Sequence, residues 1–255
     1  MPGHARRSGM PTLGATVPAM TSNPPAEPVE YRQHRFRVPA GACEILLVRH
    51  GESAPARADE PFPLVDGHGD PPLAPEGRRQ AEQLAARLAG ERIDAIYVTS
   101  LRRTAETAAP LAARLGIEPF VEPDLREVFL GDWEGGRYRQ RVAERDPLAL
   151  RAFLEEEWGV IPGAETTAEL RARVVPALSR IAARHTDQRV VVVAHGGVIG
   201  ALLAEATGSR PWAFVGADNG SISQLVVTSE RWIVRRYNDT GHLDGELSSS
   251  AEPPT

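Results

Sequence analysis

Apolar residues form two short runs that each end abruptly at a histidine. Residues 44 to 52, EILLVRHGE, carry a run of Ile, Leu and Val that stops at Arg49 and His50. Residues 190 to 195, VVVVAH, have four consecutive valines before His195. Such runs are typical of strands buried on both faces of a parallel sheet. We expect the residues that leave the carboxyl ends of these strands to lie in a ligand-binding crevice.

Elsewhere the apolar positions recur at helical spacing or in further short strands. Helices followed by strands imply parallel pairing, and two adjacent short strands near the end of the chain add an antiparallel edge. The pattern predicts an α/β protein with a mostly parallel central sheet. The predicted helices cover residues 75 to 89, 102 to 116 and 167 to 184, and the further strands are DAIYVTS (94 to 100), SISQLVVT (221 to 228) and RWIVRRYN (231 to 238).

The residues at the two strand ends suggest phosphoryl chemistry. Arg49 offers a planar fork of donors suited to phosphate, and His50 is a nucleophile or base near neutral pH. After His195, Gly196 and Gly197 open an apolar helical stretch, so their backbone N–H groups form an anion site at a helix N-terminus. Two strands therefore bring two histidines to groups that bind anions.

These strand ends also carry the motifs of a known family. Arg-His-Gly-Glu ends the first strand, and His-Gly ends the later one. In both, the chain resembles the histidine phosphatases, also called the phosphoglycerate mutase-like superfamily. Further segments resemble the family in the same order, and together the matches cover roughly residues 44 to 243. These segments are TSLRRTAETA (99 to 108), LREVFLGDWEG (125 to 135), PGAET (162 to 166) and YNDTGHL (237 to 243).

The resemblance implies a fold and a role for individual residues. The implied fold is a three-layer α/β/α sandwich. The family's second phosphate-binding arginine aligns with Arg103 rather than with Arg102, which we expect at the surface, and Thr104 replaces the usual alanine. The family's proton donor aligns with Glu127.

The implied mechanism is hydrolysis through a phosphohistidine. His50 attacks phosphorus, Glu127 protonates the departing oxygen and then activates water, and donors placed in advance stabilise the transition state. Nearby arginines should favour the neutral, nucleophilic form of His50. No cofactor is needed. The predicted catalytic residues are His50, Glu127, Arg49, Arg103 and His195, the predicted substrate-binding residues are Arg49, Arg103, His195, Gly196 and Ser53, and no metal ligands are predicted.

Composition agrees with one enzyme domain between two flanks. Residues 1 to 42 are rich in Pro, Gly and small residues, and residues 244 to 255 look similar, so we expect both to be disordered. The domain then covers residues 43 to 243. A signal peptide is the alternative for the N-terminus, but no long apolar stretch follows Arg6 and Arg7, and translation could also start at Met10 or Met20.

The net charge, the apolar runs and the cysteine content indicate which partners and which compartment to expect. The net charge is -5 and no basic stripe is visible, so we expect no nucleic acid. The longest apolar region is interrupted by a histidine and two glycines, so we expect no membrane span. Cys43 is the only cysteine, which favours a reducing, cytoplasmic setting over a disulfide or a catalytic thiol. The expected partner is a small phosphorylated substrate, and the oligomeric state, a homodimer included, stays open.

Lysine is absent, which excludes every lysine-based mechanism. Other functions remain as alternatives. A phosphoglycerate-type mutase is disfavoured because APARADEPFPLVDGHGDPPL follows Ser53 in place of the mutases' Asn-containing stretch. A non-catalytic module that binds phosphorylated ligands would lack a nucleophile or an acid, and neither is missing. Metal catalysis is disfavoured because the chain has no His-Glu-x-x-His helix or cysteine cluster.

Three assignments are less constrained. Glu52, Glu134 and the run Glu155 to Glu157 are other carboxylates that could act in place of Glu127, although the run is most simply a solvated helix face. His68 is either a loop residue or a substrate contact. We expect residues 53 to 72 and 132 to 162 to form the cap that reads the leaving group.

Overall fold

The computed structural model describes residues 30–243, and residues 38–243 belong to one compact unit. The predicted tail and residues 1–29 of the predicted N-terminal extension lie outside the described residues. The disorder of these segments and the domain bounds therefore stay predictions. No helix among residues 30–243 is long and apolar enough to cross a membrane.

A six-stranded sheet lies at the centre, with the strand order β5-β4-β6-β1-β7-β8. The first four of these strands are parallel, whereas β7 and β8 are antiparallel to their neighbours. The predicted parallel sheet with an antiparallel edge is confirmed. The strands are β1 (Cys43–Arg49), β4 (Ala95–Val98), β5 (Phe120–Val121), β6 (Arg189–Ala194), β7 (Ile222–Val227) and β8 (Trp232–Asp239), and a separate hairpin consists of β2 (Leu64–Val65) and β3 (His68–Gly69).

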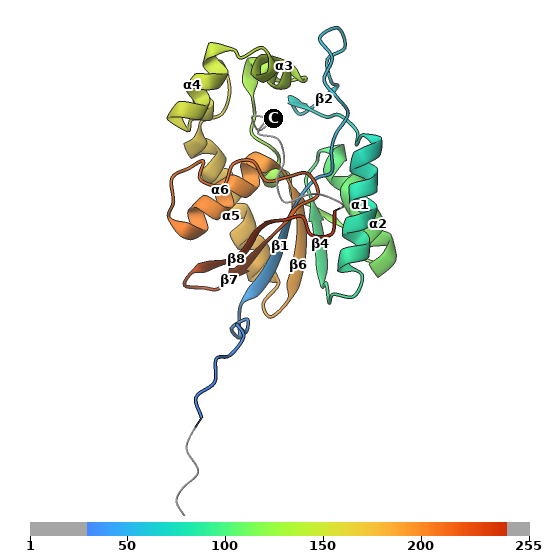
Figure 1. Cartoon of the computed structure of the whole chain (residues 1–255), viewed down its shortest axis with the longest axis vertical. Coiled ribbons are helices and arrows are strands. Elements are labelled where there is room, and N and C mark those ends of the chain that lie inside the picture. Colours follow the sequence, from blue (N-terminus) through green and yellow to red (C-terminus); the bar gives the residue numbers. More distant parts are fainter. Residues whose placement is uncertain (1–29, 244–255) are drawn as a thin grey trace, which may run out of the picture. The chain divides into compact units, whose positions relative to one another are not determined.

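Helices cover both faces of this sheet, which confirms the α/β/α sandwich (Figure 1). One layer consists of α1 (Pro75–Leu88) and α2 (Arg102–Leu115), and the other of α5 (Thr167–Arg184) and α6 (Gly196–Thr207). Beyond the carboxyl ends of the parallel strands lie the β2–β3 hairpin, α3 (Arg137–Ala143) and α4 (Pro147–Glu155) (Figure 1). Three short 3-10 turns complete the elements, at Pro123–Leu125, Gly131–Trp133 and Trp158–Val160.

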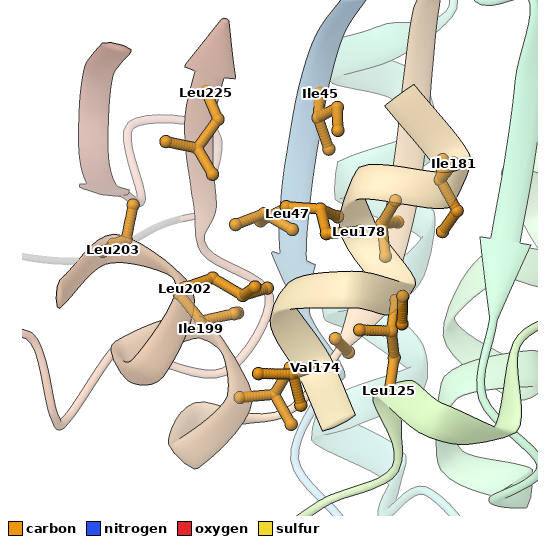
Figure 2. Packing of buried hydrophobic residues seen from close by; sticks show 14 of the residues in the cluster. Ile45, Leu47, Leu125, Val174, Leu178, Ile181, Ile199, Leu202, Leu203 and Leu225 are labelled. Atoms are coloured by element: carbon orange, nitrogen blue, oxygen red, sulfur yellow. The ribbon is translucent and has the colours of Figure 1, made fainter. Parts of the chain in front are cut away.

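The alternation of side chains along β1 builds a core on each face. Ile45 and Leu47 pack with residues of α5 and α6, whereas Leu46 and Val48 pack with residues of α1 and α2. Figure 2 shows Leu47 among side chains of α5, α6 and β7. Full burial of one such side chain contributes about 1.5–3 kcal/mol. A strand that is apolar on both faces is therefore held rigidly, and the residue that follows it is well positioned.

Local signals in the sequence explain where the helices end. α2 ends at Gly116, which has φ of 65° and caps the helix in the left-handed conformation, as predicted. α5 begins with a capping box in which Thr166 and Glu169 satisfy each other's backbone N–H groups. Cys43 lies buried at the start of β1, and burial raises the pKa of its thiol to about 12, so the reactive thiolate is disfavoured.

Candidate active site

The two histidines meet because their strands are neighbours in parallel register. Arg49 of β1 is paired with Ala194 of β6, so the next residues, His50 and His195, leave the sheet side by side. Their ring centroids are 5.2 Å apart, in an edge-to-face arrangement. The backbone N–H of His50 also donates to the carbonyl oxygen of Ala194 at 3.0 Å, which ties the strand ends together.

His50 presents one ring nitrogen to the pocket. Its Nδ1 lies 2.7 Å from the carbonyl oxygen of Gly51, so in the neutral ring Nδ1 carries the proton and Nε2 keeps its lone pair. That Nε2 accepts a hydrogen bond from Nε of Arg103 at 3.2 Å. Burial, followed by Arg103 and Arg49, places the pKa of His50 well below its ordinary value, in agreement with the predicted effect of nearby arginines. His50 is therefore neutral at neutral pH.

His195 is the N-terminal cap residue of α6 and is fully buried. Its Nε2 lies 3.0 Å from Oγ1 of Thr99, which follows β4. Its Nδ1 is buried and has no hydrogen-bond partner among the described residues. Burial and the charge of Arg103 place the pKa of this ring well below its ordinary value, so the ring is neutral.

Two arginines flank the histidines. Arg49 is anchored by a hydrogen bond from its guanidinium to the carbonyl oxygen of Ala217. Arg103, in the first turn of α2, is 7% exposed and donates to the carbonyl oxygen of Gly69 at 2.9 Å. Burial lowers its pKa to about 10, so Arg103 remains charged at neutral pH. Arg102 instead lies at the surface, paired with Glu106 at 2.7 Å, as predicted.

Glu127 lies on the loop after the first 3-10 turn, and its side chain contacts the N-terminus of α6. Its Oε1 accepts from the N–H of Val128 at 2.9 Å, and its Oε2 accepts from the N–H of Gly197 at 3.3 Å. The helix N-terminus predicted to bind an anion is thus occupied by the Glu127 carboxylate. A Cβ at Gly197 would lie 2.7 Å from Oε1 of Glu127, so only glycine permits this close approach.

Arg173 of α5 holds the loop that carries Glu127. It donates to the backbone carbonyl oxygens of Asp124, Arg126 and Glu127 at 2.7 to 2.9 Å. It also forms a two-pronged ion pair with Glu165, whose Oε1 accepts from the N–H of Phe129. Three of these five hydrogen bonds hold the backbone of the Glu127 loop directly, and the other two hold Glu165, which binds the same loop at Phe129.

One pocket is lined by most of the predicted site residues. Arg49, His50, Arg103, Glu127 and Gly196 all face it. His195 is buried beside it, against His50. The remaining wall comes from the segments expected to form the cap, from the loop that carries Glu127 and from the loop before β7. It includes Phe62, His68, Pro71, Val128, Leu130, Trp133, Glu134, Tyr138, Arg139, Trp158 and Val215.

The structure separates several other candidates. Ser53, expected to bind substrate, is 3% exposed and is not among the residues that line the pocket; its Oγ accepts from Arg139, which does line it. Glu134 faces the pocket, but both of its oxygens accept backbone N–H groups, at Gly69 and Leu130. Glu52 is exposed. Among residues 30–243, no His, Cys, Asp and Glu side chains form a group of three that could hold a metal ion.

Comparison with known proteins agrees with this geometry. A sequence profile of the histidine phosphatase superfamily (branch 1) matches residues 45–240. The chain belongs to this superfamily. The chain shares 36% identity over 215 residues with phosphoglycerate mutase-like protein 4 of Arabidopsis thaliana, covering 79% of this chain and 87% of that relative.

Its relatives include proteins named as phosphatases and others named as probable phosphoglycerate mutases. Phosphoserine phosphatase 1 of Hydrogenobacter thermophilus is 34% identical over 204 residues, covering 78% of this chain and 94% of the relative. The solved structure of a mycobacterial glucosyl-3-phosphoglycerate phosphatase is 30% identical with a TM-score of 0.64, covering 78% of this chain and all of the other. These relatives support phosphatase activity for this histidine phosphatase.

Three residues of this site were not predicted from the sequence. Thr99 supports His195, Arg173 fixes the loop of Glu127, and Arg139 brings a third guanidinium to the pocket. Thr99 belongs to the motif segment that points to Arg103, and Arg173 follows the PGAET segment, so both lay near a signal. Arg139 had no signal, because arginine is the only basic side chain other than histidine along the whole chain.

Proposed function

We propose that this histidine phosphatase is a phosphomonoesterase that hydrolyses a small phosphorylated metabolite through a phosphohistidine at His50. The observation that carries the proposal is the His50 Nε2 lone pair, in a pocket shared with two guanidinium groups and one carboxylate. A buried neutral imidazole is a competent nucleophile, and two arginines match the charge of a phosphate monoester.

The proposed reaction has two displacements at phosphorus. His50 Nε2 attacks, the P–O bond to the leaving group breaks, and Glu127 in its protonated form gives its proton to the departing oxygen. Glu127 then takes a proton from water, whose oxygen attacks phosphorus, and the P–N bond breaks to release phosphate and neutral His50. Arg49 and Arg103 bind the phosphoryl oxygens, and His195 Nδ1 is the buried donor available to another.

This chemistry requires no cofactor, because the arginines supply the charge that a metal ion supplies in other phosphatases. We also propose a cytoplasmic location. A single cysteine forms no intramolecular disulfide, which is compatible with a reducing compartment.

A mutase is the second candidate, because the first relative named above is called phosphoglycerate mutase-like. A mutase passes the phosphoryl group to a second hydroxyl rather than to water. Incubation with 3-phosphoglycerate and a bisphosphorylated primer separates the two: release of inorganic phosphate supports the hydrolase, and rapid isomerisation without release assigns a mutase.

The proposed activity is tested with p-nitrophenyl phosphate. We expect the native protein to release p-nitrophenolate and the His50→Ala variant to lose that activity. Arg102→Ala, a change at an exposed ion-paired arginine beside Arg103, is the matched control and should keep it. Absence of release by the native protein would instead support a module that binds phosphorylated ligands without turnover.

A further inference from the structure

Arg139 brings a third guanidinium to the pocket from α3, an element that contributes nothing to the reaction centre described above. It is half-buried and lines the pocket together with Arg49, His50 and Arg103. The three residues at the reaction centre come from β1, the turn that follows it, and α2. Arg139 therefore reaches the pocket from the segment of residues 132 to 162, which we expect to form the cap.

The guanidinium of Arg139 is fixed by uncharged groups. Its Nη2 donates to Oγ of Ser53 at 2.6 Å, its Nη1 donates to the carbonyl oxygen of Ala54 at 3.0 Å, and its Cζ lies 5.5 Å from the ring centroid of Phe62. These bonds use two of the five N–H groups of an arginine. The other three remain for a ligand, in a planar fork that suits a carboxylate or a phosphate.

No carboxylate within the described part of the chain forms an ion pair with Arg139. Arg141, the next arginine on α3, shows the contrast: it is paired with Glu144 and Asp146 and is half exposed. Burial, followed by the charge of Arg49, lowers the pKa of Arg139, and Glu52 only partly opposes this. A half-buried cation held next to another cation is costly without a counter-ion.

The two carboxylates of the pocket are already engaged. Glu134 accepts from the N–H groups of Gly69 and Leu130, and Glu127 accepts from those of Val128 and Gly197. Both fix backbone loops and do not pair with Arg139. An anion that neutralises Arg139 therefore has to arrive with the substrate.

We propose that Arg139 binds a second anionic group, a carboxylate or a phosphate, on the leaving-group portion of the substrate. The substrate class is then small phosphate monoesters that carry another negative charge a short carbon chain away. This inference rests on the proposed function, since it assigns Arg49 and Arg103 to the transferred phosphate. Trp133, Tyr138 and Trp158 line the same pocket and provide apolar surface for the carbon chain between the two anions.

Paired phosphonates test this directly, because their P–C bond is not hydrolysed and binding can be measured by calorimetry without turnover. Phosphonoacetate, 3-phosphonopropionate, 4-phosphonobutyrate and propane-1,3-diphosphonate are compared with the alkylphosphonates of matching length. For the native protein we expect at least one phosphonate with a second anionic group to bind about tenfold more tightly than the alkylphosphonate of the same length.

The variants locate that preference. Arg139→Leu and Arg139→Gln should bring the ratio of the two affinities to about one. Arg139→Lys keeps the positive charge but not the planar fork of donors, so it should keep part of the preference. Arg141→Leu removes an arginine from the same helix and should leave the ratio unchanged. Thermal melting of each variant confirms folding, and glutamine can keep a hydrogen bond to Ser53 if leucine disrupts α3.

Three results would overturn the proposal: equal affinities within every pair for the native protein, a ratio that survives Arg139→Leu and Arg139→Gln, or an equal loss of affinity for both members of each pair. The last would assign Arg139 to the shared phosphonate. Hydrolysis of p-nitrophenyl phosphate by the same preparations separates the two ideas. A preference for the second anionic group without hydrolysis refutes only the proposed phosphatase activity. Hydrolysis without that preference refutes only the proposed binding of a second anion by Arg139.

Discussion

Replacement of Arg173 by leucine tests whether the loop that carries Glu127 is held in place from α5. The substitution removes three hydrogen bonds to backbone carbonyl oxygens and the two-pronged ion pair with Glu165. It leaves the carboxylate of Glu165, which is 13% exposed, without its cation. The proposed general acid would keep its own contacts at Gly197 but lose the support of its backbone.

The size of the effect follows from burial. Removal of one partner from a buried ion pair costs about 3–5 kcal/mol, and an unsatisfied buried acceptor costs about 1–3 kcal/mol. Because the side chain of Arg173 is 25% exposed, water can replace part of what is lost. We therefore expect the free energy of unfolding to fall by about 2–4 kcal/mol, which lowers Tm by roughly 5–15 °C for a domain of this size.

Catalysis should change selectively, because a general acid contributes about 10²- to 10⁴-fold and only where the leaving oxygen needs a proton. For glycerol 3-phosphate, whose leaving alkoxide is strongly basic, we expect kcat/KM to fall by about 10- to 100-fold. For p-nitrophenyl phosphate, whose leaving phenolate is weakly basic, the loss should be much smaller.

Steady-state kinetics on both substrates, with Tm for each variant, measures this. Arg171→Leu is the matched control, since Arg171 lies on the same helix in an exposed ion pair with Glu205. Equal losses on the two substrates, or no loss on glycerol 3-phosphate despite a lower Tm, would refute a positioning role for Arg173 in acid catalysis.

Three further predictions follow from the site. The pKa values of His50 and His195 lie well below 6.5 in the folded protein, so these rings take up protons in the unfolded chain first as pH falls. Chemical denaturation at pH values below 6.5 should therefore show that the free energy of unfolding decreases by up to about 2.7 kcal/mol for each pH unit. A free energy that does not change with pH would contradict neutral buried rings. Gly197→Ala places a Cβ against Glu127, so kcat/KM for glycerol 3-phosphate should drop about tenfold or more, and unchanged kinetics would place the acid elsewhere. Exhaustive chelation should leave activity intact, and loss restored by a divalent metal would disprove cofactor independence.

The elements that position the reaction centre were predictable because their signals are local. Apolar runs on both faces of β1 and β6 identify buried parallel strands, and the residue after each strand is a histidine. Parallel pairing then places His50 and His195 together, although only the sheet order shows that β6 lies next to β1. Gly116 and Thr166 mark helix ends for equally local reasons.

The supports of the site were not predictable, because they depend on burial and counter-charge. In a chain whose 29 strongly basic residues are all arginine, no sequence feature separates Arg139 or Arg173 from arginines in surface ion pairs. The structure separates them by their partners. Arg141 pairs with exposed or partly exposed carboxylates, Arg173 pairs with Glu165 and donates to three loop carbonyl oxygens, and Arg139 donates only to uncharged groups. Ser53 stays a predicted substrate contact, and no sequence feature indicated that its hydroxyl accepts a hydrogen bond from Arg139.

The most direct test of the account is to trap the phosphorylated enzyme during turnover and locate the label. Rapid alkaline quench of the native protein with a phosphate-labelled substrate, followed by mass spectrometry of peptides, should find acid-labile, alkali-stable phosphate on the ring of His50. Continued hydrolysis with no label on that ring, or with the label on another side chain, would contradict nucleophilic catalysis by His50.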